Sequence, residues 1–198
     1  MKTEIIVIGT SMGGLAALET ILSGLSREFT LPIAVVQHRG VLSSDRLAVT
    51  LRRHTHLGVH EAQDKEPIKP GCIYLAPPDY HLMVEKGSFA LSTEAPVLYA
   101  RPSIDVLFQS AADAYAEGAV AVVLTGASRD GAEGAARIKE RGGRLIVQSP
   151  ATAESPVMPE AAIRAARTDW VLPLSEIGPF LNNLNCNSTA RETDMSKY

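Results

Sequence analysis

The sequence predicts an α/β fold in three layers, with helices on both faces of a doubly wound, mainly parallel sheet. Short apolar runs rich in β-branched residues, such as residues 5–8 and 119–124, alternate with longer stretches whose apolar residues recur at helical spacing. Ala, Val, Ile and Leu dominate the apolar residues, as is typical of strands buried between two helical layers. Such alternation favours parallel strands joined by right-handed crossovers.

The elements follow in order along the chain. After a first strand and a helix at residues 15–22, further strands are predicted at residues 31–37, 57–61, 72–76, 119–124, 145–148 and 170–172. Helices are predicted from Ser43 or Ser44 to residue 53, and at residues 102–115, 132–141, 159–167 and 175–184. Lys86 and Gly87 join residues 81–84 and 88–91 in an inserted antiparallel β-hairpin. We expect one domain over residues 1–184 and a polar, disordered tail over 185–198.

Composition excludes several classes of protein. The net charge of −3 without a basic run argues against a nucleic-acid partner. The N-terminal apolar run is too short for a signal peptide or a membrane span, so we expect a cytoplasmic chain with no membrane insertion. Cys72 and Cys186 stand in no pairing motif and are expected to be free thiols. His54, His56 and His60 lack a ligand pattern, so we expect no metal and no cofactor.

The turn after the first strand reads G-x-S-x-G from Gly9 to Gly13, immediately before a helix. Three interpretations of Ser11 are open at this point. Its hydroxyl could cap the helix by accepting from the N–H of Gly13 or Gly14. The turn could instead cradle a phosphate of a dinucleotide, or Ser11 could be a nucleophile held on a tight bend.

Three polar residues follow predicted parallel strands: Ser11, His38 and Asp130. Ligands bind beyond the carboxyl ends of such strands, so these side chains are expected along one edge of the sheet. A hydroxyl, an imidazole and a carboxylate together suit acyl transfer. Taken singly, His38 could simply end a strand and hydrogen-bond a loop. Asp130 could be a helix N-cap, with Glu133 completing a capping box. Their joint placement with Ser11 favours catalysis.

Two common sites of α/β proteins fit less well. A dinucleotide site of the NAD type needs a glycine at the position of Ser11 and an acidic residue after the second strand, where this chain has His38. Arg39 leaves a phosphate-bearing ligand open. An ordinary α/β-hydrolase has its triad in the order Ser, Asp, His and an HGGG-type loop, whereas the order here is Ser, His, Asp.

The chain resembles the catalytic domain of the CheB-type chemotaxis protein-glutamate methylesterases over residues 4–183. The resemblance rests on several segments that occur together and in order. They are Ile8-Gly9-Thr10-Ser11-Met12-Gly13-Gly14, Val36-Gln37-His38, Ile73-Tyr74-Leu75-Ala76-Pro77-Pro78-Asp79-Tyr80-His81-Leu82, Pro102-Ser103-Ile104-Asp105-Val106-Leu107-Phe108, Val123-Leu124-Thr125-Gly126, Asp130-Gly131-Ala132, Gly142-Gly143, Ile146-Val147-Gln148 and Met158-Pro159-Glu160-Ala161-Ala162.

The resemblance implies a serine hydrolase that removes methyl groups from glutamyl methyl esters on chemoreceptor signalling helices and deamidates glutamines at such sites. The triad of the family falls on Ser11, His38 and Asp130. We expect the backbone N–H groups of the turn at Met12 and Gly13 to form the oxyanion hole. The implied partners are the cytoplasmic helices of methyl-accepting receptors and a separate regulatory protein.

The sequence departs from the family pattern at two places. Met12 stands where a small residue is usual. The T-G-M-G-x-D-G loop of the family has Ala127 and Ser128 in place of its methionine and second glycine. Met12 could refill the space beside Ala127. A second hypothesis follows from these changes, namely an inactive binding module that recognises receptor helices or an anionic ligand at the same crevice. Many relatives also carry a receiver domain, and the early first strand leads us to expect a stand-alone or excised catalytic unit.

Overall fold

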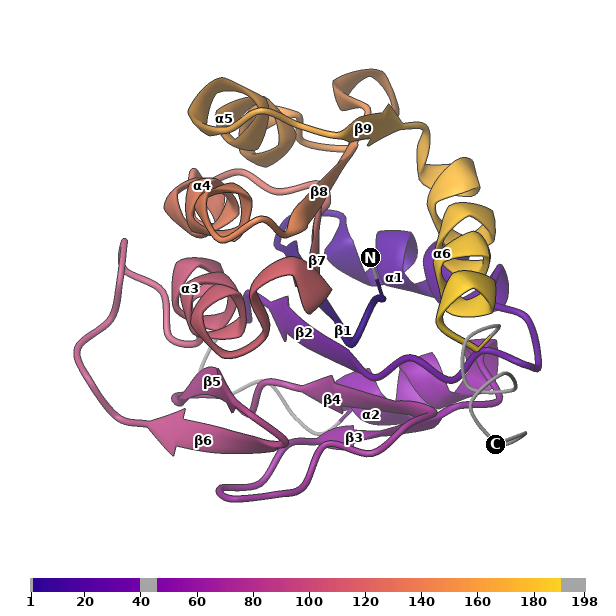
Figure 1. The fold of residues 1–198 in the computed structure, drawn as a ribbon. Coiled ribbons are helices and arrows are strands. Elements are labelled where there is room, and N and C mark those ends of the chain that lie inside the picture. Colours follow the sequence, from indigo (N-terminus) through magenta and orange to yellow (C-terminus); the bar gives the residue numbers. More distant parts are fainter. Residues whose placement is uncertain (1, 40–45, 190–198) are drawn as a thin grey trace.

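The computed structural model describes residues 2–39 and 46–189 and has a seven-stranded sheet at its centre. The strands run in the order β3-β4-β2-β1-β7-β8-β9, and every neighbouring pair is parallel. Their bounds are β1 Ile5–Thr10, β2 Ile33–Gln37, β3 Gly58–Glu61, β4 Cys72–Leu75, β7 Ala119–Val123, β8 Arg144–Gln148 and β9 Trp170–Leu172. The predicted parallel sheet is confirmed, with its central strand β1 between β2 and β7 (Figure 1).

Helices cover both faces of the sheet, which confirms the three layers. Side chains alternate between the faces of a strand, so Ile6 and Ile8 of β1 pack with one set of helices and Ile5 and Val7 with the other. The first set is α1 (Gly14–Ser23), α2 (Arg46–Leu51) and α6 (Leu174–Thr189). The second set is α3 (Ile104–Tyr115), α4 (Ala132–Glu140) and α5 (Val157–Ala165). Three short 3₁₀ turns complete the described helices: Arg52–His54, Ala116–Gly118 and Pro150–Thr152.

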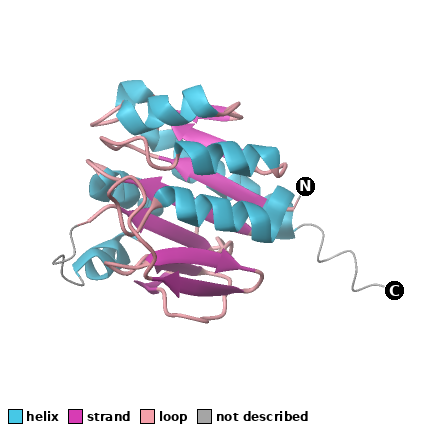
Figure 2. Cartoon of the chain, turned by 90° about the vertical axis from the view of Figure 1, so that its left-hand side faces the viewer, coloured by secondary structure: helices cyan, strands magenta, loops and turns pink. Residues whose placement is uncertain are grey.

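The inserted hairpin forms a separate two-stranded antiparallel sheet, as predicted. Its strands are β5 (His81–Glu85) and β6 (Ser88–Ser92). Figure 2 shows this pair of strands at the bottom of the molecule, beside the helical layer that contains α3. Leu82 and Phe89 of the hairpin are fully buried in the same apolar cluster as α3. The hairpin therefore extends the core on one side of α3.

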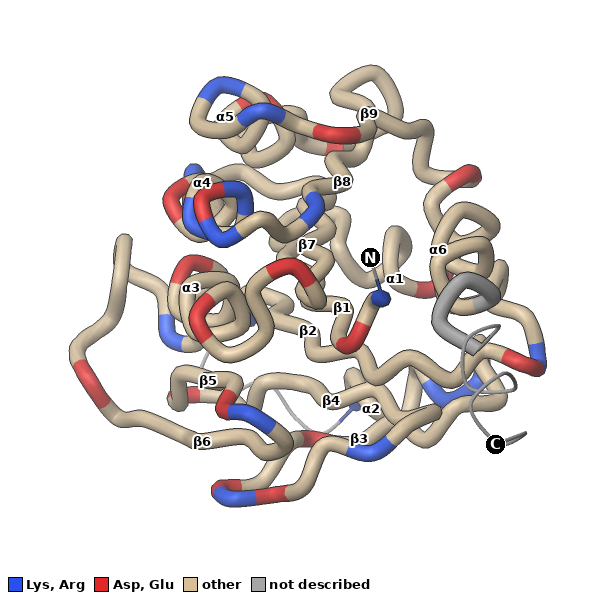
Figure 3. Tube along the Cα trace, viewed as in Figure 1, with Lys and Arg blue, Asp and Glu red and all other residues tan. Residues whose placement is uncertain are grey.

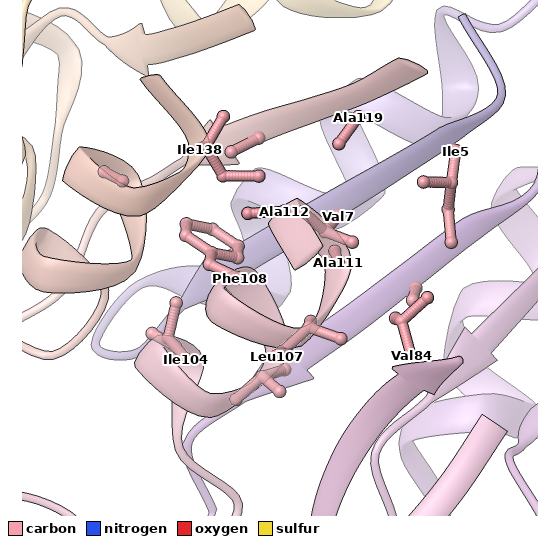
Figure 4. Close-up of a cluster of buried hydrophobic side chains, with 14 of the residues drawn as sticks. Ile5, Val7, Val84, Ile104, Leu107, Phe108, Ala111, Ala112, Ala119 and Ile138 are labelled. Atoms are coloured by element: carbon pink, nitrogen blue, oxygen red, sulfur yellow. The ribbon is translucent and has the colours of Figure 1, made fainter. Parts of the chain in front are cut away.

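Helix α3 is amphipathic, and its apolar side chains belong to the apolar cluster on the α3–α5 side of the sheet. Ile104, Leu107 and Phe108 are fully buried, and Figure 4 shows them in one apolar cluster with Val7 of β1, Ala119 of β7 and Ile138 of α4. Burial of each such large side chain stabilises the fold by roughly 1.5–3 kcal/mol. Gly9 permits this close approach, because a Cβ there would lie 2.2 Å from Cγ2 of Ile104. The start of α3 is thereby fixed beside the end of β1.

Two boundaries differ from the predictions or fall outside the described residues. Helix α6 continues to Thr189, although its apolar periodicity ends at Leu184. The polar Asn185 is buried at its C-terminal part, where it donates to the carbonyl of Glu28 and accepts from the N–H of Thr30. Periodicity alone cannot reveal such an anchor. The predicted disordered tail is wrong for residues 185–189, which belong to α6. The proposed helix starts at Ser43 or Ser44 lie outside the described residues, as do residues 190–198, for which the tail stays a prediction.

Candidate active site

The ends of β1 and β2 bring Ser11 and His38 to the same edge of the sheet. Thr10 and Gln37 are paired in the register of the two parallel strands, and Ser11 and His38 are the next residues along each strand. The N–H of His38 donates to the carbonyl of Thr10 over 3.0 Å. The N–H of Ser11 donates to the carbonyl of Thr125, after β7, over 3.0 Å. The backbone of Ser11 is thus fixed between the neighbouring strand ends.

Gln37 ties these two backbone segments together, which the sequence reasoning missed. Its side-chain Nε2 donates to the carbonyl of Ser11 over 2.8 Å and to the carbonyl of His38 over 3.0 Å. A polar residue at the end of an otherwise buried strand was the available signal. The amide holds the serine turn and the histidine segment in a fixed relation.

The side chain of His38 contacts that of Asp130, as expected. His38 Nε2 lies 2.7 Å from Oδ2 of Asp130, and the two side chains are 16% and 0% exposed. An ionised carboxylate can only accept hydrogen bonds, so the proton of a neutral imidazole must be on Nε2. The other ring nitrogen, Nδ1, then keeps a lone pair that can accept a proton. The aspartate therefore fixes the tautomer that a general base requires.

Asp130 is buried among hydrogen-bond donors from the first turn of α3. Its Oδ1 accepts from the Ser103 hydroxyl over 2.9 Å and from the N–H of Asp105 over 3.0 Å, and its Oδ2 accepts from the N–H of Ile104 over 2.7 Å. Burial alone would raise the pKa of Asp130, but the hydrogen bonds from His38, Asp105 and Ile104 together hold this pKa below its ordinary value. The positive end of the helix dipole acts in the same direction. Asp130 is thus ionised at neutral pH.

Neither capping interpretation describes these residues. The N-cap of α4 is Gly131 and that of α1 is Gly13, and neither helix has a side-chain cap. Asp130 accepts hydrogen bonds from the start of a different helix, α3, which is far away in the sequence. At Ser11 the backbone carbonyl, not the hydroxyl, accepts from the N–H of Gly14 over 3.0 Å. The serine hydroxyl is not used to cap the helix.

The turn predicted to form the oxyanion hole is tightly constrained. Gly13 has a left-handed φ of 75°, and a Cβ at this position would lie 2.7 Å from the Cβ of Glu154. Within the described parts of the chain, the N–H groups of Met12 and Gly13 have no acceptor. Met12 does not refill a buried space beside Ala127, contrary to expectation, because its side chain is 54% exposed and Ala127 is exposed as well.

A second buried carboxyl group, Asp105, lies directly beside Asp130. It is 2% exposed, its Oδ1 accepts from the N–H of Gly134 over 2.7 Å, and its Oδ2 has no partner. Burial raises the pKa of Asp105 to about 7. The N–H of Gly134 acts in the opposite direction, and the charge of Asp130 raises the pKa further. The sequence gives no sign of a special role for Asp105, since an acidic residue in the first turn of a helix is ordinary.

A cavity of about 500 Å³ opens beside His38. Its walls include Arg39, Ser128 and the segment from Pro96 to Pro102 that precedes α3. The described residues contain no group of three or more side chains suited to hold a metal ion. His60 pairs instead with Glu66 over 2.7 Å. No helix in the described part of the chain is long and apolar enough to cross a membrane.

A parallel sheet with a histidine–aspartate pair next to a serine turn defines this chain as an α/β domain of the hydrolase class. The CheB methylesterase profile matches residues 6–181, and the chain belongs to the CheB methylesterase family. A protein of Leptospira interrogans, named provisionally as a protein-glutamate methylesterase/protein-glutamine glutaminase, is 44% identical over 95% of this chain and 98% of its own length.

Other relatives agree with this assignment. A protein-glutamate methylesterase/protein-glutamine glutaminase of Caulobacter vibrioides is 42% identical over 90% of this chain, which spans about half (53%) of that protein. The crystal structure of the Thermotoga maritima CheB methylesterase catalytic domain superimposes with a TM-score of 0.87 at 36% identity. That match covers 93% of this chain and all of the other chain (100%). The relatives bear the names of enzymes, and the hypothesis of an inactive binding module has no support among them.

Proposed function

We propose that this chain hydrolyses glutamyl methyl esters on chemoreceptor signalling helices, and deamidates glutamines at equivalent positions, with Ser11, His38 and Asp130 as its triad. Family membership supports the reaction class. The 2.7 Å contact between His38 and the buried, ionised Asp130 is the observation that carries the catalytic assignment. A purely structural ion pair would not need to lie beside the serine turn, whereas His38 and Ser11 directly follow the paired residues Gln37 and Thr10.

In the proposed mechanism, Nδ1 of His38 takes the proton of the Ser11 hydroxyl as its oxygen attacks the ester carbonyl. The negative charge that develops on the carbonyl oxygen is stabilised by the N–H groups of Met12 and Gly13 at the start of α1. Asp130 stabilises the imidazolium through Nε2–H without taking its proton. The imidazolium then protonates the departing methoxide, and methanol leaves an acyl-enzyme.

Water completes the reaction. His38 accepts a proton from the water as it attacks the acyl carbon, and Ser11 recovers its proton when the glutamate carboxylate is released. With glutamine the same steps release ammonia in place of methanol. Receptor signalling helices lie in the cytoplasm, where we place the reaction, and we propose control by a separate regulatory protein.

The proposal predicts that Ser11→Ala lowers methanol release from a methylated receptor fragment by about 10³-fold or more, because the nucleophile is lost. Ser23→Ala, which removes an exposed hydroxyl on α1, should match the wild type. An acylating probe should label Ser11 stoichiometrically in the wild type. A loss below tenfold in the Ser11 variant, with the probe on another residue, would remove Ser11 from the nucleophile role.

A further inference from the structure

The loop between β6 and α3 forms an arm, residues 93–102, that extends away from the body of the molecule (Figure 1). Val97 and Ala100 exchange two backbone hydrogen bonds of 3.1 and 2.8 Å across a tight turn. The two residues at its tip, Leu98 and Tyr99, have left-handed φ values of 47° and 64°. Residues with side chains rarely adopt this backbone region, so the turn needs support from its surroundings.

Two side chains supply that support at the base of the arm. The guanidinium of Arg101 donates to Asp79 and to the carbonyls of Thr93 and Glu94, the latter two over 2.9 and 3.0 Å. The buried His81 contacts the carbonyl of Ala95 over 3.2 Å through Nε2. Figure 3 shows an acidic segment and a basic segment on the two limbs of the arm. The arm is therefore shaped before any ligand binds.

The tip of the arm presents a large aromatic ring to solvent. Tyr99 is 103% exposed, compared with 54% or less for the other exposed large apolar residues in the described chain. Leu98 and Tyr99 also line the 500 Å³ cavity that has His38 in its wall. Tyr99 thus stands at the rim of the cavity beside His38, and its side chain is exposed to solvent.

The methylated glutamyl side chain of the proposed substrate is short. The ester carbonyl of a glutamyl residue lies at most about 4–5 Å from its Cα, because only three carbon–carbon bonds separate them. A substrate helix with side chains is about 10–12 Å across. For the ester to reach Ser11, the backbone of the substrate helix must come close to the C-terminal ends of the parallel strands. The flanks of that helix must then contact the rim of the cavity. The arm lines the cavity beside His38 and is therefore part of that rim.

We propose that the arm forms one wall of the substrate groove and that Tyr99 packs against the helix that carries the methyl ester. This inference rests on the proposed function and names its docking residue. Tyrosine suits this role because its rigid ring supplies a large contact area and loses little conformational entropy on binding. The occupant is the substrate helix, because Leu98 and Tyr99 line the cavity that has His38, the proposed catalytic base, in its wall.

The test compares a protein substrate with a small one. Tyr99→Asn removes the ring and suits the left-handed turn, which asparagine tolerates, while Tyr99→Phe keeps the ring. Ile163→Asn, on the exposed side of α5, is the matched control. Methanol release is measured from a methylated receptor signalling fragment and from N-acetylglutamate γ-methyl ester.

We expect Tyr99→Asn to lower kcat/KM for the receptor fragment about tenfold or more, mainly through KM, and to change the small-ester rate less than twofold. Tyr99→Phe and Ile163→Asn should match the wild type. In a Ser11→Ala background, Tyr99→Asn should weaken binding of the methylated fragment by the same factor. Equal loss on both substrates, or no loss on the fragment, overturns the role of the arm. A wild-type chain that releases no methanol from either substrate overturns the proposed function itself.

Discussion

The buried carboxyl groups of Asp130 and Asp105 lie side by side at the start of α3. They differ in the number of hydrogen bonds that they accept. Asp130 is fully buried and accepts hydrogen bonds from four donors, on His38, Ser103, Ile104 and Asp105. Asp105 is equally buried, but it has one donor, the N–H of Gly134, and an oxygen without a partner.

The difference shows that the number of hydrogen-bond donors around a carboxyl group, and not its burial, decides which of the two groups is ionised. Burial opposes ionisation at both sites, yet the pKa of Asp130 is lowered and that of Asp105 is raised to about 7. Two adjacent negative charges would repel each other, so the carboxyl group that ionises is the one that contacts the imidazole of His38. The neighbouring group stays protonated over most of the acidic range. Three variants test this contrast.

The largest effect is expected from Asp130→Asn. The amide presents N–H groups as well as an oxygen, so it can favour the tautomer of His38 with its proton on Nδ1, which cannot accept a proton from serine. We expect methanol release from a methylated receptor fragment to fall by about 10³-fold or more at pH 7. Asp113→Asn changes a half-exposed carboxylate on α3, the helix whose first turn contacts Asp130; this variant is the control and should keep its activity. A fall below tenfold for Asp130→Asn would mean that its charge is not needed.

A change in the pH dependence of stability is expected from Asp105→Asn. Between pH 3.8 and about 7 the folded chain keeps the Asp105 proton and the unfolded chain loses it, so wild-type stability falls as pH rises through this window. The fall is about 1.4 kcal/mol per pH unit from this group. The Asp105→Asn variant has no titrating group at this position and therefore shows no such fall. Its free energy of unfolding relative to the wild type should rise from pH 4.5 to pH 7 and then level off.

Urea unfolding of both chains at pH 4.5, 6 and 8 measures this relative stability. The contribution of Asp130 cancels in the comparison, since both chains contain it. The new amide group costs some stability at every pH because its N–H groups need acceptors. Only the slope therefore tests the titration, and parallel curves for the two chains would show that Asp105 is ionised in the folded state.

The smallest effect is expected from Ser103→Ala. This change removes one of the four donors to Asp130 and the side-chain cap of α3, which accepts from the N–H of Val106. We expect a loss of about 1–2 kcal/mol in the free energy of unfolding and a smaller fall in activity than with Asp130→Asn. Ser103→Thr keeps the hydroxyl and should recover most of both. If the threonine variant behaves like the alanine variant, the donated hydrogen bond is not the cause.

The sequence allowed the positions of the site residues to be predicted, because each follows an apolar strand with a recognisable pattern. Ser11 and His38 follow paired residues of β1 and β2, and Asp130 lies in the loop after β7, as the rule on the carboxyl ends of parallel strands requires. The capping interpretation of Asp130 was wrong for a physical reason. Local spacing cannot show that a residue accepts hydrogen bonds from a helix that begins 26 residues before it.

The sequence by itself determined the alternation of strands and helices, the hairpin and the order of the polar strand ends, since hydrophobic periodicity and turn residues act over short distances. Only the tertiary structure decided which nitrogen of His38 faces the aspartate and how Gln37 joins two strand ends. It also decided which of two buried aspartates is charged and where the ring of Tyr99 stands. These properties depend on donors, acceptors and exposure contributed by segments far apart in the chain, and such contacts exist only after folding has brought the segments together.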